Sequence, residues 1–199
     1  RIASGLKYLL RCARMAPRQA AWLRVVYGSP RLTEILAHDP RLLERWHHHY
    51  INRRFGRATR MAVAADHFRF VFARLPDDLA DGVYLRGRHR IGALVLKDGS
   101  ELRIELRRPT GRSREGELAL CLTNSQDQVL SSAVFTVADD GRALLIGCMQ
   151  GACAELGREA VRELTKQCHG LRPKNLLFSL LLAFASEYGI ERVRGVANL

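Results

Sequence analysis

Lysine, long apolar runs and closely spaced cysteine pairs are all scarce in this chain of 199 residues. Its longest strongly apolar run, 176–185, has ten residues, whereas a helix needs about 20 to span a bilayer. The first 15 residues mix apolar and basic side chains and contain no apolar core of signal-peptide type. Five cysteines are too few and odd in number for a disulfide-stapled domain. We therefore expect a cytoplasmic protein without a transmembrane segment.

The common catalytic and metal-binding signatures are also missing. The sequence contains no G-x-x-x-x-G-K-[ST], no G-x-G-x-x-G and no G-x-S-x-G. Cys148 and Cys153 have no second cysteine pair to complete a tetrahedral site. The triplet at 47–49 is all histidine, but consecutive side chains on a helix point about 100° apart and cannot converge on one ion. We expect His47 to pack and the next two to be solvated, with no metal site.

Acidic residues are rare in the first part of the chain. Residues 1–74 hold 15 basic and four acidic residues, a net charge of +11, whereas residues 75–199 come close to neutrality. The change in composition predicts two parts, a basic helical region at 1–75 and an α+β domain at 76–199. The basic part can be a plain solvated surface or a contact with an anion or a membrane surface, and nucleic acid is the weaker alternative, since no known DNA- or RNA-binding pattern accompanies it. Both ends of the sequence look like cuts, and we expect the second part to be cut short at its C-terminus.

Capping residues and periodicity predict helices in the basic part. Ser29 and Asp39 each precede a proline, the pairing of N-cap and first helical residue that begins many helices. Residues 59–75 have apolar residues at helical spacing, and residues 1–27 also favour a helix.

An antiparallel meander of about five strands is predicted next. Residues 102–107 alternate between apolar and charged, and Asp98-Gly99 supplies the preceding hairpin turn. Further strands are expected at 117–123, 129–137 and 143–150. A helix over 155–168 ending at Gly170, a Leu-rich helix from Pro173 and a last strand over 190–197 complete an α+β fold. The Leu-rich helix is apolar nearly all round and should be buried against the sheet.

Several segments together resemble the VirK/YbjX family of bacterial proteins, whose molecular activity is not established. The resemblance extends over about residues 20–198 and rests mainly on the stretch His169-Gly-Leu-Arg-Pro-Lys-Asn175, supported by 115–118, 147–151, 195–198, Tyr50 and 66–68. Family members continue beyond Asn198 with a segment that includes a histidine. The resemblance implies roles in virulence and stress tolerance, including envelope defence and the DNA-damage response.

The order of strands and helices is also similar to that of acyl-CoA N-acyltransferases, although their Gln/Arg-x-x-Gly-x-Gly/Ala signature is absent. The start of the Leu-rich helix would offer free backbone N–H groups beside two cations, a suitable site for a pyrophosphate. The candidate cofactor-binding residues are Gly170, Arg172, Lys174 and Asn175. The alternative is that Pro173 merely begins a helix and both cations are solvated.

Three residues are candidates for the general base of such an enzyme. Glu115 and Glu117 are two apart, on one face of a predicted strand, and His169 lies in the same loop as the candidate cofactor residues. Turn or rim positions for the two glutamates are the alternative. Two functions stay open: an acyltransferase-like enzyme or ligand binder that takes an acyl-CoA or a similar phosphorylated ligand, and a non-enzymatic factor that uses its basic helices on nucleic acid or an anionic membrane surface.

Overall fold

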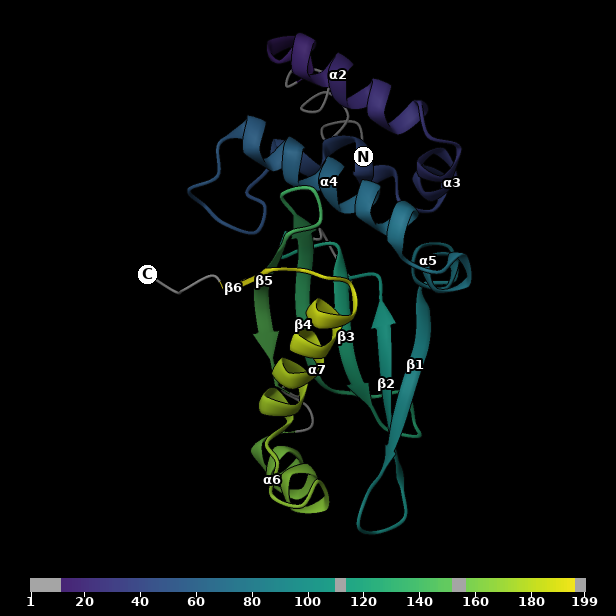
Figure 1. Cartoon of the computed structure of the whole chain (residues 1–199), viewed down its shortest axis with the longest axis vertical. Coiled ribbons are helices and arrows are strands. Elements are labelled where there is room, and N and C mark those ends of the chain that lie inside the picture. The colour runs from purple at the N-terminus through teal and green to yellow at the C-terminus, as the bar shows by residue number, and fades with distance from the viewer. Residues whose placement is uncertain (1–11, 110–113, 152–156, 196–199) are drawn as a thin grey trace.

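The computed structural model describes residues 12–109, 114–151 and 157–195, and it joins a layer of helices to a six-stranded sheet (Figure 1). The helices before the sheet are α2 (Ala16–Tyr27), α3 (Pro30–His38), the 3-10 helix η1 (Pro40–His47), α4 (Arg57–Arg74) and α5 (Asp77–Tyr84). Three features named from the sequence, namely any helix over residues 1–11, Cys153 and Asn198, lie outside the described residues.

Both predicted helix starts are confirmed by their caps. The Ser29 Oγ accepts a hydrogen bond from the Leu32 N–H at 3.4 Å, and the Asp39 Oδ1 accepts one from the Arg41 N–H at 3.2 Å. The segment after Asp39 is a 3-10 helix that ends at His47. The other two histidines of the triplet therefore lie beyond its end, while His47 is buried as expected.

Helix α4 connects the helical layer to the sheet, as its apolar stripe predicts. Val63, Ala64, Phe68 and Val71 are buried on this helix, and α4 packs against the fourth strand. The core continues without a break from Trp22 of α2 through α4 into the sheet. The helical layer and the sheet therefore share one hydrophobic core.

The sheet consists of the predicted five-stranded meander and the predicted last strand. Its order is β1-β2-β3-β4-β5-β6, with neighbours antiparallel except for the last pair. The strands are β1 (Arg88–Val95), β2 (Glu101–Arg107), β3 (Leu118–Thr123), β4 (Val129–Ala138), β5 (Ala143–Gln150) and β6 (Arg192–Gly195). Gly99 has a φ of +79° in the β1–β2 turn, the left-handed conformation for which glycine was expected.

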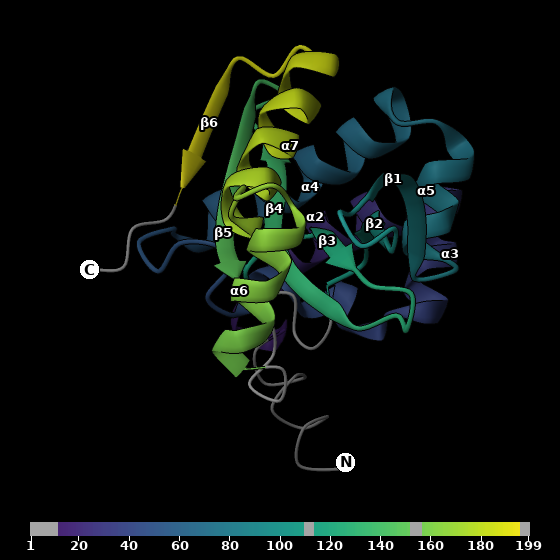
Figure 2. The same ribbon diagram turned by 90° about the horizontal axis from the view of Figure 1, so that it is seen from below.

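Two helices carry the chain from β5 to β6, which runs parallel to it along the sheet edge (Figure 2). They are α6 (Gly157–Gln167) and α7 (Pro173–Glu187). Gly170 follows α6 with a φ of +84°, and its N–H donates to the Thr165 carbonyl at 2.8 Å. This is the helix-ending conformation predicted for that glycine.

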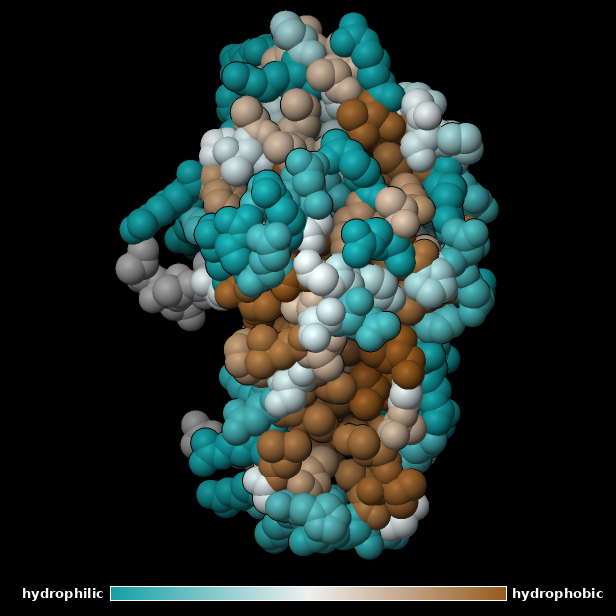
Figure 3. Space-filling view, in the orientation of Figure 1, coloured by the Kyte–Doolittle hydropathy of each residue, from teal (hydrophilic) through white to brown (hydrophobic). Residues whose placement is uncertain are grey.

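The Leu-rich helix α7 is buried on one side only. Leu177 and Leu181 are fully buried, and the helix packs on β3 and β4. Phe178 and Leu182 keep 44% of their surface exposed, and apolar surface gathers over this part of the molecule (Figure 3). The predicted burial of this helix against the sheet is therefore confirmed, while its outer side stays exposed at Phe178 and Leu182.

Candidate functional site

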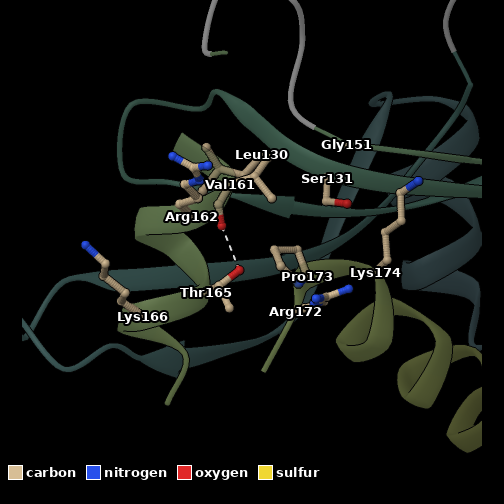
Figure 4. Close-up of a pocket in the computed structure, with 10 residues that line it drawn as sticks. All are labelled: Leu130, Ser131, Gly151, Val161, Arg162, Thr165, Lys166, Arg172, Pro173 and Lys174. Atoms are coloured by element: carbon tan, nitrogen blue, oxygen red, sulfur yellow. Dashed lines mark hydrogen bonds between the residues drawn. The ribbon is translucent and has the colours of Figure 1, made fainter. Parts of the chain in front are cut away.

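A pocket of about 560 Å³ lies between α6, the start of α7 and the ends of β4 and β5. We call it the α6–α7 pocket. Arg162 and Lys166 project from α6 on one side, and Arg172 and Lys174 from the start of α7 on the other (Figure 4). Among the described residues that line the pocket there is no carboxylate. The site therefore presents four cations to whatever enters it.

The four cations are not equivalent. Arg162 pairs with Glu159 at 2.8 Å and Lys166 with Glu163 at 3.6 Å, both across one turn of α6 and both highly exposed. Such exposed pairs contribute little and are readily rearranged. Neither Arg172 nor Lys174 has an ion pair with a described residue. The two cations named from the sequence are thus the ones available to an anion.

The remaining wall of the pocket is apolar or already hydrogen-bonded. Leu130, Val161 and Pro173 contribute apolar surface. The Ser131 hydroxyl donates to the Gln150 carbonyl at 2.8 Å, and the Thr165 hydroxyl donates to the Val161 carbonyl at 2.7 Å (Figure 4). These two oxygens retain lone pairs but no free proton, so they can accept hydrogen bonds and the cations supply the donors.

The turn between α6 and α7 differs from the expected row of free backbone N–H groups. The N–H groups of Gly170, Leu171 and Asn175 donate to the carbonyls of Thr165, Cys168 and Arg172, respectively. The predicted N–H cradle is therefore wrong for these three positions. Asn175 is exposed and does not line the pocket. His169 is exposed in this turn, with a φ of +56°, and of the predicted cofactor residues the structure brings Arg172 and Lys174 into the pocket.

The two candidate glutamates do not share a face of a strand. Both precede β3, Glu115 is exposed, and Glu117 is 1% exposed. Gly116 separates them with a φ of +153°, so the chain turns between the two side chains. The prediction that they form a pair on one strand face is wrong, because alternation applies only to extended chain.

Glu117 is the centre of a buried polar cluster. Its Oε1 lies 2.8 Å from the Arg45 Nε and accepts a hydrogen bond from the Tyr50 hydroxyl at 2.9 Å. Arg45 also reaches the Asp39 carboxylate at 2.7 Å. Burial raises the pKa of Glu117 to about 7, against the lowering effects of Arg45 and Tyr50. This carboxyl is enclosed by its partners and links η1 to the sheet.

His67 extends this cluster from α4. Its Nδ1 accepts from the Val137 N–H at 3.2 Å, so the proton of the neutral ring is on Nε2, which donates to the Tyr84 hydroxyl at 2.6 Å. The Tyr84 hydroxyl donates in turn to the Glu117 carbonyl at 3.4 Å. Burial, followed by the Arg45 cation, lowers the pKa of His67 to about 3. The ring is therefore a neutral bridge between helix and sheet.

Glu115 lies against β5 beside a cysteine that sequence reasoning considered only as a metal ligand. A Cβ on Gly147 would come within 1.8 Å of the Glu115 carbonyl oxygen, so the two backbones are in direct contact there. The half-buried Cys148 follows Gly147. Burial raises the pKa of the Cys148 thiol, the Glu115 carboxylate adds to this, and Lys174 opposes it. Cys148 thus lies within electrostatic reach of both a predicted base and a predicted cofactor residue.

Together these observations define an α+β protein with a cationic, partly apolar pocket beside the end of its antiparallel meander. The part of the chain that the structure describes has no helix long and apolar enough to cross a bilayer. The chain belongs to the DUF535 family, described as proteins of unknown function, whose model matches residues 1–199.

Several curated proteins are similar to this chain. The uncharacterized protein YbjX of Escherichia coli K12 is 27% identical over 198 residues, which cover 96% of this chain and 59% of YbjX. The membrane protein LapB of Mannheimia haemolytica is 28% identical over 175 residues, covering 86% of this chain and 72% of LapB. The resemblance to the VirK/YbjX family is confirmed. The chain spans about three fifths of the length of YbjX.

Proposed function

We propose that the α6–α7 pocket binds a phosphorylated ligand that also carries an apolar group, with an acyl-CoA as the model compound. The observation behind this proposal is the set of four cations around a pocket that no described carboxylate lines. Phosphate oxygens accept charge-assisted hydrogen bonds from arginine and lysine, the strongest class of such bonds. Arg172 and Lys174 are the principal contacts in this proposal.

The size and lining of the pocket favour a ligand larger than an inorganic ion. Its volume of about 560 Å³ falls within the range of about 300 to 1,000 Å³ that is typical of small-molecule sites. Leu130, Val161 and Pro173 offer apolar contact that a bare anion would not use. A ligand with a charged group and an apolar group could contact both the cations and the apolar residues that line the pocket.

The acyltransferase form of the proposal assigns the base to Glu115. The amine nitrogen of the acceptor forms a bond to the thioester carbonyl carbon, the C–S bond breaks and the CoA thiolate leaves, while the amine proton passes to the Glu115 carboxylate. Exposure leaves Glu115 accessible to an acceptor, and both Glu115 and the pocket residue Lys174 influence the pKa of the Cys148 thiol. Glu117 is enclosed by Tyr50 and Arg45, so Glu115 is the better candidate, with His169 as the alternative.

Calorimetric titration of the full-length protein with CoA and with an acyl-CoA tests the proposal. We expect micromolar binding that the Arg172→Ala, Lys174→Ala double variant weakens at least tenfold. The matched control is Arg18→Ala with Arg24→Ala, two exposed residues of α2 whose loss removes the same charge. Tighter binding of the acyl-CoA than of CoA would support the apolar half of the site.

Each outcome of this titration is informative. No heat with either compound, or equal weakening in both double variants, would contradict the proposed pocket. Binding without turnover of an amine acceptor would identify a ligand binder, and turnover that Glu115→Gln abolishes would identify an enzyme.

The basic helices favour one alternative function, contact with an anionic surface. Residues 1–74 hold the net charge of +11, and the relative LapB is named a membrane protein. In that case, binding to anionic vesicles should fall steeply with salt, and the control variant on α2 rather than the pocket variant should weaken it. The cytoplasmic location and the roles in virulence and stress tolerance stay predictions from the sequence and the family resemblance.

A further inference from the structure

A second cationic pocket, of about 450 Å³, lies at the start of α4. We call it the α4 pocket. It is lined by His47, His48, His49, Gly56, Arg57, Arg60 and Arg114. In Figure 1, the loop before α4 lies in the upper half of the molecule, whereas α6 lies at the lower end. The two pockets are therefore separate and share no lining residue.

The charges at this end of α4 are the reverse of the usual ones. A helix N-terminus carries a partial positive charge and is normally accompanied by acidic residues or a side-chain cap. Helix α4 has Gly56 as its N-cap, no side-chain cap and no acidic residue in its first turn. Arg57 and Arg60 stand there instead. Two cations at the N-terminus of this 18-residue helix are repelled by its partial positive charge and by each other. An anion bound between them would offset both repulsions.

Arg60 supplies an independent observation. Its side chain is buried, with 9% of the residue exposed, although no carboxylate pairs with it among the described residues. The Nη1 donates to the His48 carbonyl at 2.8 Å, and the Nη2 lies 3.3 Å from the His49 Nδ1. The buried Nε has no partner in the part of the chain that the structure describes. Burial, followed by repulsion from Arg57, lowers the pKa of Arg60.

The opposite wall of the pocket is held by the loop that precedes β3. The Ile51 N–H donates to the Arg114 carbonyl at 2.6 Å, which fixes the backbone of Arg114 beside the 47–56 loop. Glu44 pairs with one lining histidine, its Oε2 lying 3.5 Å from the His48 Nε2. The three arginines that line the pocket have no ion pair with a carboxylate in the described part of the chain.

We propose that the α4 pocket binds the phosphate group of a phosphomonoester. A phosphate dianion would accept from the exposed Arg57 and Arg114, with the buried Arg60 cation behind them, and it would also meet the N–H groups of the first turn of α4. The three arginines more than neutralise the two charges of such a group and equal its terminal oxygens in number. The source can be a soluble compound or the headgroup of phosphatidic acid.

Calorimetry with inorganic pyrophosphate and flotation with phosphatidic-acid vesicles test this site in the full-length protein. We expect Arg57→Gln and Arg114→Gln, both exposed and therefore safe for folding, each to weaken pyrophosphate binding about tenfold. Arg60→Gln should have the largest effect. The control is Arg24→Gln on α2, which removes the same charge outside the pocket.

The pattern across these variants decides the question. Weakening by the three pocket variants, with the control within twofold of wild type, supports the site. If the same variants also reduce vesicle binding, the phosphate belongs to a lipid, and if they leave vesicles unaffected, it belongs to a soluble ligand. No pyrophosphate binding at millimolar concentration, or equal loss in Arg24→Gln, overturns the proposal. Because the α6–α7 pocket could also bind pyrophosphate, the titrations are repeated in the Arg172→Ala, Lys174→Ala background, which isolates the α4 pocket.

Discussion

Replacing Glu117 by glutamine tests whether burial or the ion pair with Arg45 decides the charge of this carboxyl. Burial raises its pKa to about 7, although Arg45 and Tyr50 both act to lower it. Glutamine keeps the acceptor oxygen for Tyr50 and Arg45, and Arg45 keeps Asp39 at 2.7 Å. We therefore expect the variant to fold, which allows its stability to be measured against pH.

The direction of the pH dependence follows from where the proton is bound. Between the unfolded pKa of 4.5 and the folded value of about 7, the folded protein retains a proton on Glu117 that the unfolded chain has lost. The contribution of Glu117 is thus fully present below pH 4.5 and is lost as the pH rises through 7. The slope is about 1.4 kcal/mol per pH unit, or about 3 kcal/mol over the window.

His67 acts in the opposite direction. Its pKa falls from 6.5 to about 3 on folding, so the unfolded chain binds a proton that the folded protein does not. Stability from this group rises by about 1.4 kcal/mol per unit between pH 3 and 6.5. In the wild type, the two contributions nearly cancel between pH 4.5 and 6.5. Glu117→Gln removes one of them and exposes the other.

Urea unfolding followed by circular dichroism across this pH range measures the effect. We expect the free energy of unfolding of Glu117→Gln, taken relative to wild type, to rise by about 3 kcal/mol between pH 4.5 and 7. The matched control, Glu115→Gln, changes an exposed carboxyl and should run parallel to wild type. A difference that does not change with pH would refute the reasoning, because it would mean that Arg45 outweighs burial.

Two further predictions concern packing. Gly147→Ala should destabilise the protein by about 2–3 kcal/mol in thermal or urea unfolding, because its Cβ would meet the Glu115 carbonyl oxygen at 1.8 Å; Gly151→Ala, with nothing within 4 Å, is the control, and equal stability of the two would contradict this contact. Leu177→Ala should cost about 2–5 kcal/mol and Leu182→Ala less than about 1 kcal/mol, since the former is fully buried and the latter 44% exposed; similar losses would show that the outer side of α7 is covered.

Local patterns predicted the elements of this fold well. The caps at Ser29 and Asp39 report on hydrogen bonds to residues two or three positions away, and these are set by the adjacent sequence. The apolar stripe of α4 repeats from one helical turn to the next, and the alternation in β2 repeats every second residue. Both patterns can therefore be recognised within a short stretch of sequence. Features that are determined by residues close together in the sequence can therefore be predicted from the sequence alone.

The site depended on contacts that periodicity does not encode. Glu117 meets Arg45, which is 72 positions away, and nothing in its neighbourhood distinguishes it from the exposed Glu115. No motif in the sequence distinguishes Arg162 and Lys166, and only the position of α7 makes them part of the wall of a pocket. Arg172 and Lys174 were found because a distinctive local stretch happened to include them.

The buried ion pair between η1 and the segment before β3 has a consequence for how the protein folds. Arg45 and Glu117 can leave water at low cost only when both are in place, because a single buried charge without its partner is strongly unfavourable. A partly folded state with the helices docked but the sheet unformed would leave Arg45 paired with Asp39 and without its Glu117 partner. The contact with Glu117 is thus gained only when both parts are in place, which couples the formation of the helices to that of the sheet.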